Sequence, residues 1–109
     1  MRTHYDMRRE AVEGVSNLIF FATQHGDTSG VNACERKLTD SERRFSKGEF
    51  EGLKEIVEHV AKLRALNTQY DNIPDGETES VCNEVEAEED WLAAQSKIFK
   101  KRFGHLLLN

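Results

Sequence analysis

The chain has 109 residues, a net charge of −5, 32% charged residues, 38% apolar residues and a single proline. This length suits one domain that buries a core without disulfides, and the high charge content with a single proline is expected of a helical protein rather than a disordered one. The acidic balance argues against non-specific binding of nucleic acid or of an anionic membrane through the whole surface.

The terminal segment and the cysteines indicate a compartment. No stretch offers the roughly 18 apolar residues of a membrane-spanning helix, and the charged start is not followed by the apolar segment of a secretory signal. Cys34 and Cys82 are the only cysteines. We therefore expect a cytoplasmic protein that does not enter a membrane, with two free thiols rather than a structural disulfide.

A first helix is predicted over residues 4–24, where apolar residues recur at helical spacing. Its expected core face consists of Ala11, Val12, Val15, Leu18, Ile19 and Ala22. Phe20 points almost opposite this face and Phe21 lies off its centre, so this end of the helix is a candidate contact surface. Gly26 is expected to end the helix, because glycine readily takes the left-handed conformation found after helix C-termini.

A second helix is predicted over residues 31–45, with Thr28 or Ser29 of the preceding loop as its N-cap. Its narrow apolar face holds Val31, Cys34, Leu38 and Phe45. The segment 39–42 offers an alternative, in which this helix is broken into two short pieces. The stretch is locally basic, but it lacks the interleaved aromatic residues on which nucleic-acid bases stack, so nucleic-acid binding is not expected.

The third helix, over residues 47–68, has the strongest pattern. Ser46 and Glu49 form an S-x-x-E capping box. The apolar face that follows holds Phe50, Leu53, Ile56, Val57, Val60 and Ala61. Arg64 interrupts this face, and the apolar residues continue on a rotated face as Leu63, Leu66 and Tyr70. Arg64 either covers apolar surface with its stem while its charge reaches water, or forms a buried ion pair.

The fourth helix is predicted over residues 79–103, after a Pro-Asp-Gly turn. One apolar stripe holds Val81, Val85, Leu92, Phe99 and Phe103, and a second holds Ala87, Trp91, Ala94 and Ile98. A polar seam of Glu88, Gln95 and Arg102 at seven-residue spacing separates them. Two stripes indicate two neighbours, and a seam at this spacing is typical of a helix interface whose register it sets.

The third and fourth helices should be antiparallel. Arg64 then lies near the start of the last helix, and we expect an Arg64–Glu88 ion pair, or failing that a pair with Glu84. The tail 104–109 contains three leucines, which would be a liability if exposed. It is expected to fold onto its own bundle or to bind another subunit or protein.

The sequence shows no motif for catalysis or metal binding. His25 and Cys34 are the side chains that an enzyme would most plausibly use, but neither has a partner at motif spacing, and His59 is expected to be solvated. No catalytic residue, metal ligand or cofactor is assigned. A pocket between helices near Tyr70, Trp91 and Arg64 could hold a nucleotide-like ligand, as an aromatic–arginine combination can.

These patterns predict an all-α, antiparallel four-helix bundle in one domain, with the second helix either continuous or broken and with dimerisation through the last helix. The absence of catalytic motifs, combined with surplus apolar surface, favours a small non-enzymatic protein-binding regulator or inhibitor. Its partner would be another protein or a second copy. The candidate partner-binding residues are Phe20, Leu63, Leu66, Tyr70, Trp91, Ile98, Leu106 and Leu107. The alternative is a protein that binds or sequesters a small nucleotide-like ligand.

Overall fold

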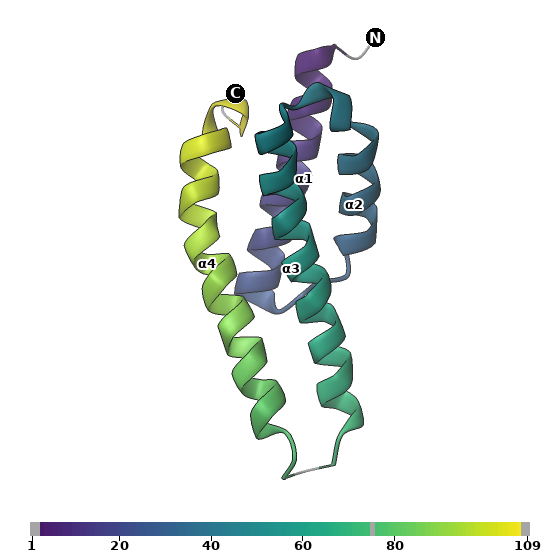
Figure 1. The fold of residues 1–109 in the computed structure, drawn as a ribbon, viewed down its shortest axis with the longest axis vertical. Helices are drawn as coiled ribbons and strands as arrows, with labels where there is room; N and C mark the ends of the chain where they lie inside the picture. The colour runs from purple at the N-terminus through teal and green to yellow at the C-terminus, as the bar shows by residue number, and fades with distance from the viewer. Residues whose placement is uncertain (1–2, 75, 108–109) are drawn as a thin grey trace.

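The computed structural model describes residues 3–74 and 76–107, and over these residues the prediction of an all-α fold is confirmed. The elements are α1 (His4–His25), α2 (Val31–Asp40), the short 3-10 helix η1 (Glu42–Arg44), α3 (Lys47–Asn72) and α4 (Glu79–Leu107) (Figure 1). The molecule measures 53 × 24 × 24 Å. The three long helices pack against one another, whereas the short α2 packs on α1 and α3 (Figure 1).

Capping boxes begin two of the helices. At α3, the Ser46 hydroxyl accepts from the Glu49 N–H (3.2 Å) and the Glu49 carboxylate accepts from the Ser46 N–H (2.9 Å), as predicted. Thr3 and Asp6 form the same arrangement at the start of α1, at 3.0 and 3.2 Å, and this second box was not predicted. Such a cap is worth about 1 kcal/mol, because it satisfies backbone N–H groups that have no partner within the helix.

The loop from Gly26 to Gly30 corrects one prediction and confirms another. Gly26 has a left-handed backbone (φ 64°) and its N–H donates to the Phe21 carbonyl, so it ends α1 as expected. The expected capping of α2 by Thr28 or Ser29 is wrong. Gly30 occupies the N-cap position without a side-chain bond, since Ser29 is hydrogen-bonded to Asp27 instead.

The predicted second helix is broken, at the place where the sequence suggested a break. α2 ends at Asp40, and the Ser41 hydroxyl donates to the Lys37 carbonyl at 3.0 Å, a local bond that competes with helix continuation. η1 follows, and Phe45 then takes an extended conformation and is buried. Arg8 of α1 fixes this corner by donating to the Arg44 carbonyl (3.2 Å) and pairing with Glu49 (3.3 Å).

The last two helices are longer than predicted. α3 continues to Asn72 rather than residue 68, and α4 continues to Leu107 rather than residue 103. Most of the predicted tail is therefore helical and folds onto its own chain, because Leu106 continues the buried stripe of α4 and is only 2% exposed. Residues 108 and 109 of that tail lie outside the described part of the chain.

The core lies between α1, α3 and α4, with α2 closing one side. Every residue of the predicted α1 face is buried, as are the central residues of the predicted α3 face and most of the first α4 stripe. Phe50 and Val85 are half-buried, and Ala61 is exposed. The lower parts of α3 and α4 extend beyond the end of α1 as a pair of helices, in which Leu66 and Val81 are buried (Figure 1).

Candidate functional site

Three aromatic rings lie together on the outer side of α1 at its C-terminal end. Phe20 and Phe21 are 52% and 46% exposed, and their ring centroids lie 5.5 Å apart in an edge-to-face arrangement. The His25 ring lies 5.6 Å from Phe20 and 5.9 Å from Phe21. These three residues form the aromatic cluster of α1. Contacts between such rings are favourable, yet two large apolar side chains remain in water.

A surface hollow adjoins this cluster between α1 and the loop before α2. It has a volume of about 290 Å³, and Phe21 and Leu18 line it on the helix side, while Asp27, Ser29 and Gly30 line it on the loop side. The Ser29 hydroxyl (2.6 Å) and the Ser29 N–H (2.9 Å) both donate to Asp27. These bonds lower the pKa of Asp27, the hydroxyl bond most strongly. The hollow therefore combines an apolar wall with a carboxylate that is charged at neutral pH.

Apart from Trp91, which packs toward α3, the second apolar stripe of α4 faces outward. Ala87, Ala94 and Ile98 are exposed, Ile98 by 54%. Trp91 is half-buried because its ring stacks on His59 of α3, with centroids 3.7 Å apart and an angle of 18° between the planes. We call Ala87, Trp91, Ala94 and Ile98 the outer face of α4.

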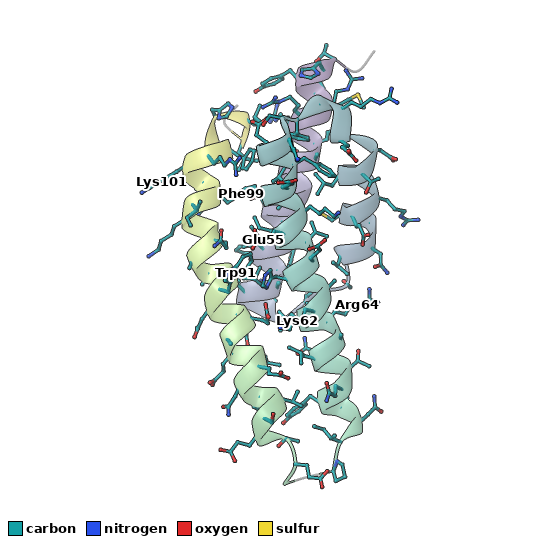
Figure 2. All side chains as sticks on the ribbon, in the orientation of Figure 1. Glu55, Lys62, Arg64, Trp91, Phe99 and Lys101 are labelled. Carbon is teal, nitrogen blue, oxygen red and sulfur yellow. The ribbon has the colours of Figure 1, made fainter. Side chains whose placement is uncertain are left out.

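The predicted Arg64–Glu88 ion pair is wrong. Glu88 is 6% exposed, and its two carboxylate oxygens contact His59 Nδ1 at 2.5 Å and Lys62 Nζ at 2.9 Å. Arg64 is exposed and makes no ion pair with any described residue, and it lies on the side of α3 away from Trp91 (Figure 2). Glu84, the alternative partner, is also exposed. The expectation of a solvated His59 is wrong as well, because this ring bridges Glu88 and Trp91.

Opposing influences set the pKa of Glu88. Burial raises it, but hydrogen bonds from His59 and Lys62, together with their charges, outweigh burial and hold the pKa below its usual value. In turn, the hydrogen bond that the Lys62 ammonium donates to the Glu88 carboxylate raises the pKa of Lys62. This cluster satisfies a buried carboxylate, so we assign it to the packing of α3 against α4.

The polar seam of α4 faces α3. Glu88 makes the contacts just described, and the Arg102 guanidinium lies against Gly52 and Gly48 of α3. A Cβ added to Gly52 would come within 2.7 Å of Arg102 Nη1, whereas one at Gly48 would meet Nη2 at 3.5 Å. The two glycines, one helical turn apart, thus make room for the arginine. The seam marks an interface within the chain.

Several predicted partner-binding residues are not available at the surface. Leu63, Leu66 and Leu106 are 2%, 7% and 2% exposed, so the expectation that they form spare apolar surface is wrong. These three side chains are instead covered by the other helices of the same chain. Leu107 is half-buried, and Tyr70 remains 45% exposed.

The constellation predicted for a nucleotide-like ligand is not formed. Trp91 lies between α3 and α4, and Arg64 points away from it (Figure 2). Tyr70 lines a different hollow of about 290 Å³, with Asn67, Cys82, Val85 and Glu86. The physical reason is the orientation of α3 about its own axis. The side of α3 that carries His59 and Leu63 faces α4, and the side that carries Arg64 faces solvent.

The two side chains considered for catalysis lie in very different surroundings. His25 belongs to the exposed aromatic cluster of α1, and Cys34 is buried beside Gly14, where burial raises its pKa to about 11. Cys82 is exposed, and both thiols are free. Within the described residues, no group of three or more His, Cys, Asp and Glu side chains is placed to hold a metal ion. No helix in the described part of the chain is both long and apolar enough to cross a membrane.

The sequence pattern pointed to Phe20 and Phe21 as surface residues, but their association with His25 was not predicted. The spacing of four residues between Phe21 and His25 was the available signal, because side chains four residues apart on a helix are neighbours. The hollow beside them depends on the loop before α2 and has no signal in the helical pattern. Comparisons of this chain with protein-family models, with curated proteins and with solved structures find no match.

Proposed function

We propose that this protein is a small non-enzymatic regulator or inhibitor that binds another protein through the aromatic cluster of α1. The observation that supports this most strongly is the exposure of Phe20 and Phe21, two large rings on one short stretch of surface. Exposed aromatic residues beside a hollow resemble the anchor sites at which protein interfaces concentrate their binding energy. The rings are held by a capped helix, so little conformational entropy is lost when they bind.

The chemistry of the hollow favours a particular kind of partner. Phe21 and Leu18 offer an apolar wall for an aliphatic or aromatic side chain, and the charged Asp27 favours a lysine or arginine next to it. The net charge of −5 acts in the same direction over longer distances, because it steers basic surfaces toward the protein. The partner should therefore present an apolar anchor beside a basic residue.

We also propose that the four helices keep an antiparallel arrangement in solution. Their directions alternate along the chain in Figure 1, and short connections join α1 to α2 and α3 to α4. This arrangement supports the binding proposal because it leaves the end of α1 uncovered.

A selection from a random peptide library tests the binding proposal, because it requires no named partner. Wild-type protein serves as bait, and the variant with Phe20→Ser and Phe21→Ser serves as the matched comparison. Both rings are exposed, so the variant should fold like wild type by circular dichroism. Tyr70→Ser, at an aromatic residue of similar exposure on α3, is the control.

We expect enriched peptides with an apolar residue next to lysine or arginine. They should bind the double variant at least about tenfold more weakly than wild type, and the Tyr70→Ser control should bind as wild type does. Asp27→Asn should remove the preference for a basic residue while keeping the preference for an apolar one. Equal binding to wild type and to the double variant would overturn the proposal.

A further inference from the structure

The outer face of α4 carries an apolar stripe whose form suits another helix. Ala87, Trp91, Ala94 and Ile98 follow one another at spacings of four, three and four residues, the pattern of a helix–helix contact. Ala87 and Ala94 are small, so a second helix can approach the backbone closely. Ile98 is 54% exposed, which leaves an aliphatic side chain for that helix to cover.

Charge is divided along the same helix. The exposed acidic residues Glu84, Glu86 and Asp90 lie before the centre of the stripe, and the exposed basic residues Lys97, Lys101 and Arg102 lie after it. The helix dipole favours this order in an isolated helix. It also makes the face complementary to itself when a second α4 runs in the opposite direction. Two parallel copies would place like charges together, which is unfavourable.

We propose that a second copy of this chain docks on the outer face of α4, with the two α4 helices antiparallel about a two-fold axis beside Ala93 and Ala94. This interface is independent of the aromatic cluster of α1. A two-fold interface uses the same surface of both copies, so a single self-complementary stripe is sufficient to build it.

One register satisfies the charges and the stripe together. With the axis between Ala93 and Ala94, Asp90 lies opposite Lys97 of the second copy, and Glu86 lies opposite its Lys101. At 100° per residue these four charged residues lie on one flank of the stripe, and a two-fold axis brings that flank of one copy against the same flank of the other.

The remaining residues agree with this register. Glu84 and Arg102 lie on the opposite flank, where the Arg102 guanidinium already packs against Gly52 of α3, so the pairs Asp90–Lys97 and Glu86–Lys101 set the register. The half-buried Trp91, whose ring packs on His59, falls level with the gap between Ala94 and Ile98 of the second copy, so it meets the small Ala94 on one side and Ile98 on the other. The apolar stripe supplies most of the affinity in this arrangement, whereas exposed ion pairs mainly fix direction and register.

Cysteine cross-linking tests the geometry directly. In a Cys82→Ser background, Ala94→Cys places two thiols beside the proposed axis, and Ala87→Cys places them about 20 Å apart along the helices, since the two positions are 13 residues apart in the proposed pairing at about 1.5 Å each. In a glutathione redox buffer, we expect Ala94→Cys to form a covalent dimer and Ala87→Cys to remain uncrosslinked. Cross-linking of both variants would indicate parallel helices, and cross-linking of neither would indicate that this face is not an interface. Either result would overturn the proposal.

Sedimentation equilibrium with exchanged charges tests the register. Asp90→Lys and Lys97→Asp should each weaken the dimer by about three- to tenfold, because each change alters two symmetric pairs. Combining them should restore the dimer to within about threefold of wild type. Ile98→Ser should give a folded monomer, and Asp71→Lys, a charge reversal on the exposed end of α3, should leave association unchanged. A monomeric wild type at millimolar concentration, or a double exchange as weak as the single changes, would contradict the proposal.

Discussion

Glu88 and His59 meet across the interface of α3 and α4, where a carboxylate oxygen and the imidazole Nδ1 lie 2.5 Å apart although 29 residues separate them in sequence. Lys62 contacts the other carboxylate oxygen at 2.9 Å, and Trp91 covers the imidazole ring. A carboxylate that is only 6% exposed is therefore partnered on both oxygens. This relationship makes Glu88 the polar residue whose removal should matter most for stability.

Glu88→Ala should lower the free energy of unfolding by about 1–3 kcal/mol, because the change removes two hydrogen bonds to a charged, buried acceptor. Glu88→Gln keeps the volume and part of the bonding, so it should cost less. Urea unfolding followed by circular dichroism at low protein concentration measures both. Glu55→Ala, at an exposed carboxylate of α3, should change the free energy by less than about 0.5 kcal/mol. A loss no larger than that control would show that the contacts of Glu88 add nothing to stability.

Stability should fall as the pH is lowered below about 4.5, the ordinary pKa of the glutamates involved. The Ser46 N–H lowers the pKa of Glu49, and the hydrogen bonds and charges of His59 and Lys62 lower the pKa of Glu88 in spite of its burial. A depressed pKa in the folded state adds stability above the unfolded pKa, and this stability is lost as the pH falls through the folded value.

Urea unfolding from about pH 6 down to about pH 3 at constant ionic strength measures this dependence. Glu49→Gln and Glu88→Gln should each be less stable than wild type near pH 6 and should each show a shallower loss on acidification. Parallel curves for wild type and both variants would mean that other carboxyl groups dominate the dependence.

Gly52→Ala should show coupling to Arg102. Alanine favours a helix interior over glycine by about 1 kcal/mol, but a Cβ at Gly52 would lie 2.7 Å from the guanidinium, which must then move. We expect Gly52→Ala to stabilise the protein by about 1 kcal/mol in an Arg102→Ala background and by less when Arg102 is present. Gly48→Ala, where the added Cβ has ordinary contact distance at 3.5 Å, is the matched control and should show no such dependence. Urea unfolding of the double-mutant cycle provides the values, and equal effects of Gly52→Ala in both backgrounds would exclude the coupling.

The two thiols should react with Ellman's reagent at very different rates. Cys82 is exposed, whereas Cys34 is 8% exposed and burial raises its pKa to about 11, so about one part in ten thousand of it is thiolate at neutral pH. In the folded protein we expect a fast phase from one thiol and a slow phase from the other. In urea we expect both thiols to react in the fast phase. Cys82→Ser should remove the fast phase, and a fast reaction of Cys34 in the folded protein would show that α2 opens readily.

The sequence by itself determined the local structure. The spacing of apolar residues placed the faces of α1 and α3 and the first stripe of α4, because a residue's position on a helix depends only on the 3.6-residue period. The capping pair Ser46 and Glu49, and the glycine that ends α1, were equally local. The break between α2 and η1 could be suggested but not decided, since it depends on how well Phe45 can be buried beyond it.

Only the tertiary structure decided which faces meet. The spacing of apolar residues along α3 is the same whichever side of the helix faces α4. The orientation that α3 takes in the fold makes His59 rather than Arg64 the partner of Glu88, and it leaves Arg64 in solvent. The sequence showed the rotated face of Leu63 and Leu66, but it did not show that α4 covers this face or that His59 belongs to it, because that depends on how far α3 and α4 extend beyond α1. The same packing buried Leu63, Leu66 and Leu106 and left Phe20 and Ile98 exposed, because the burial of an apolar side chain depends on whether a neighbouring helix covers it, and sequence spacing along one helix does not record that.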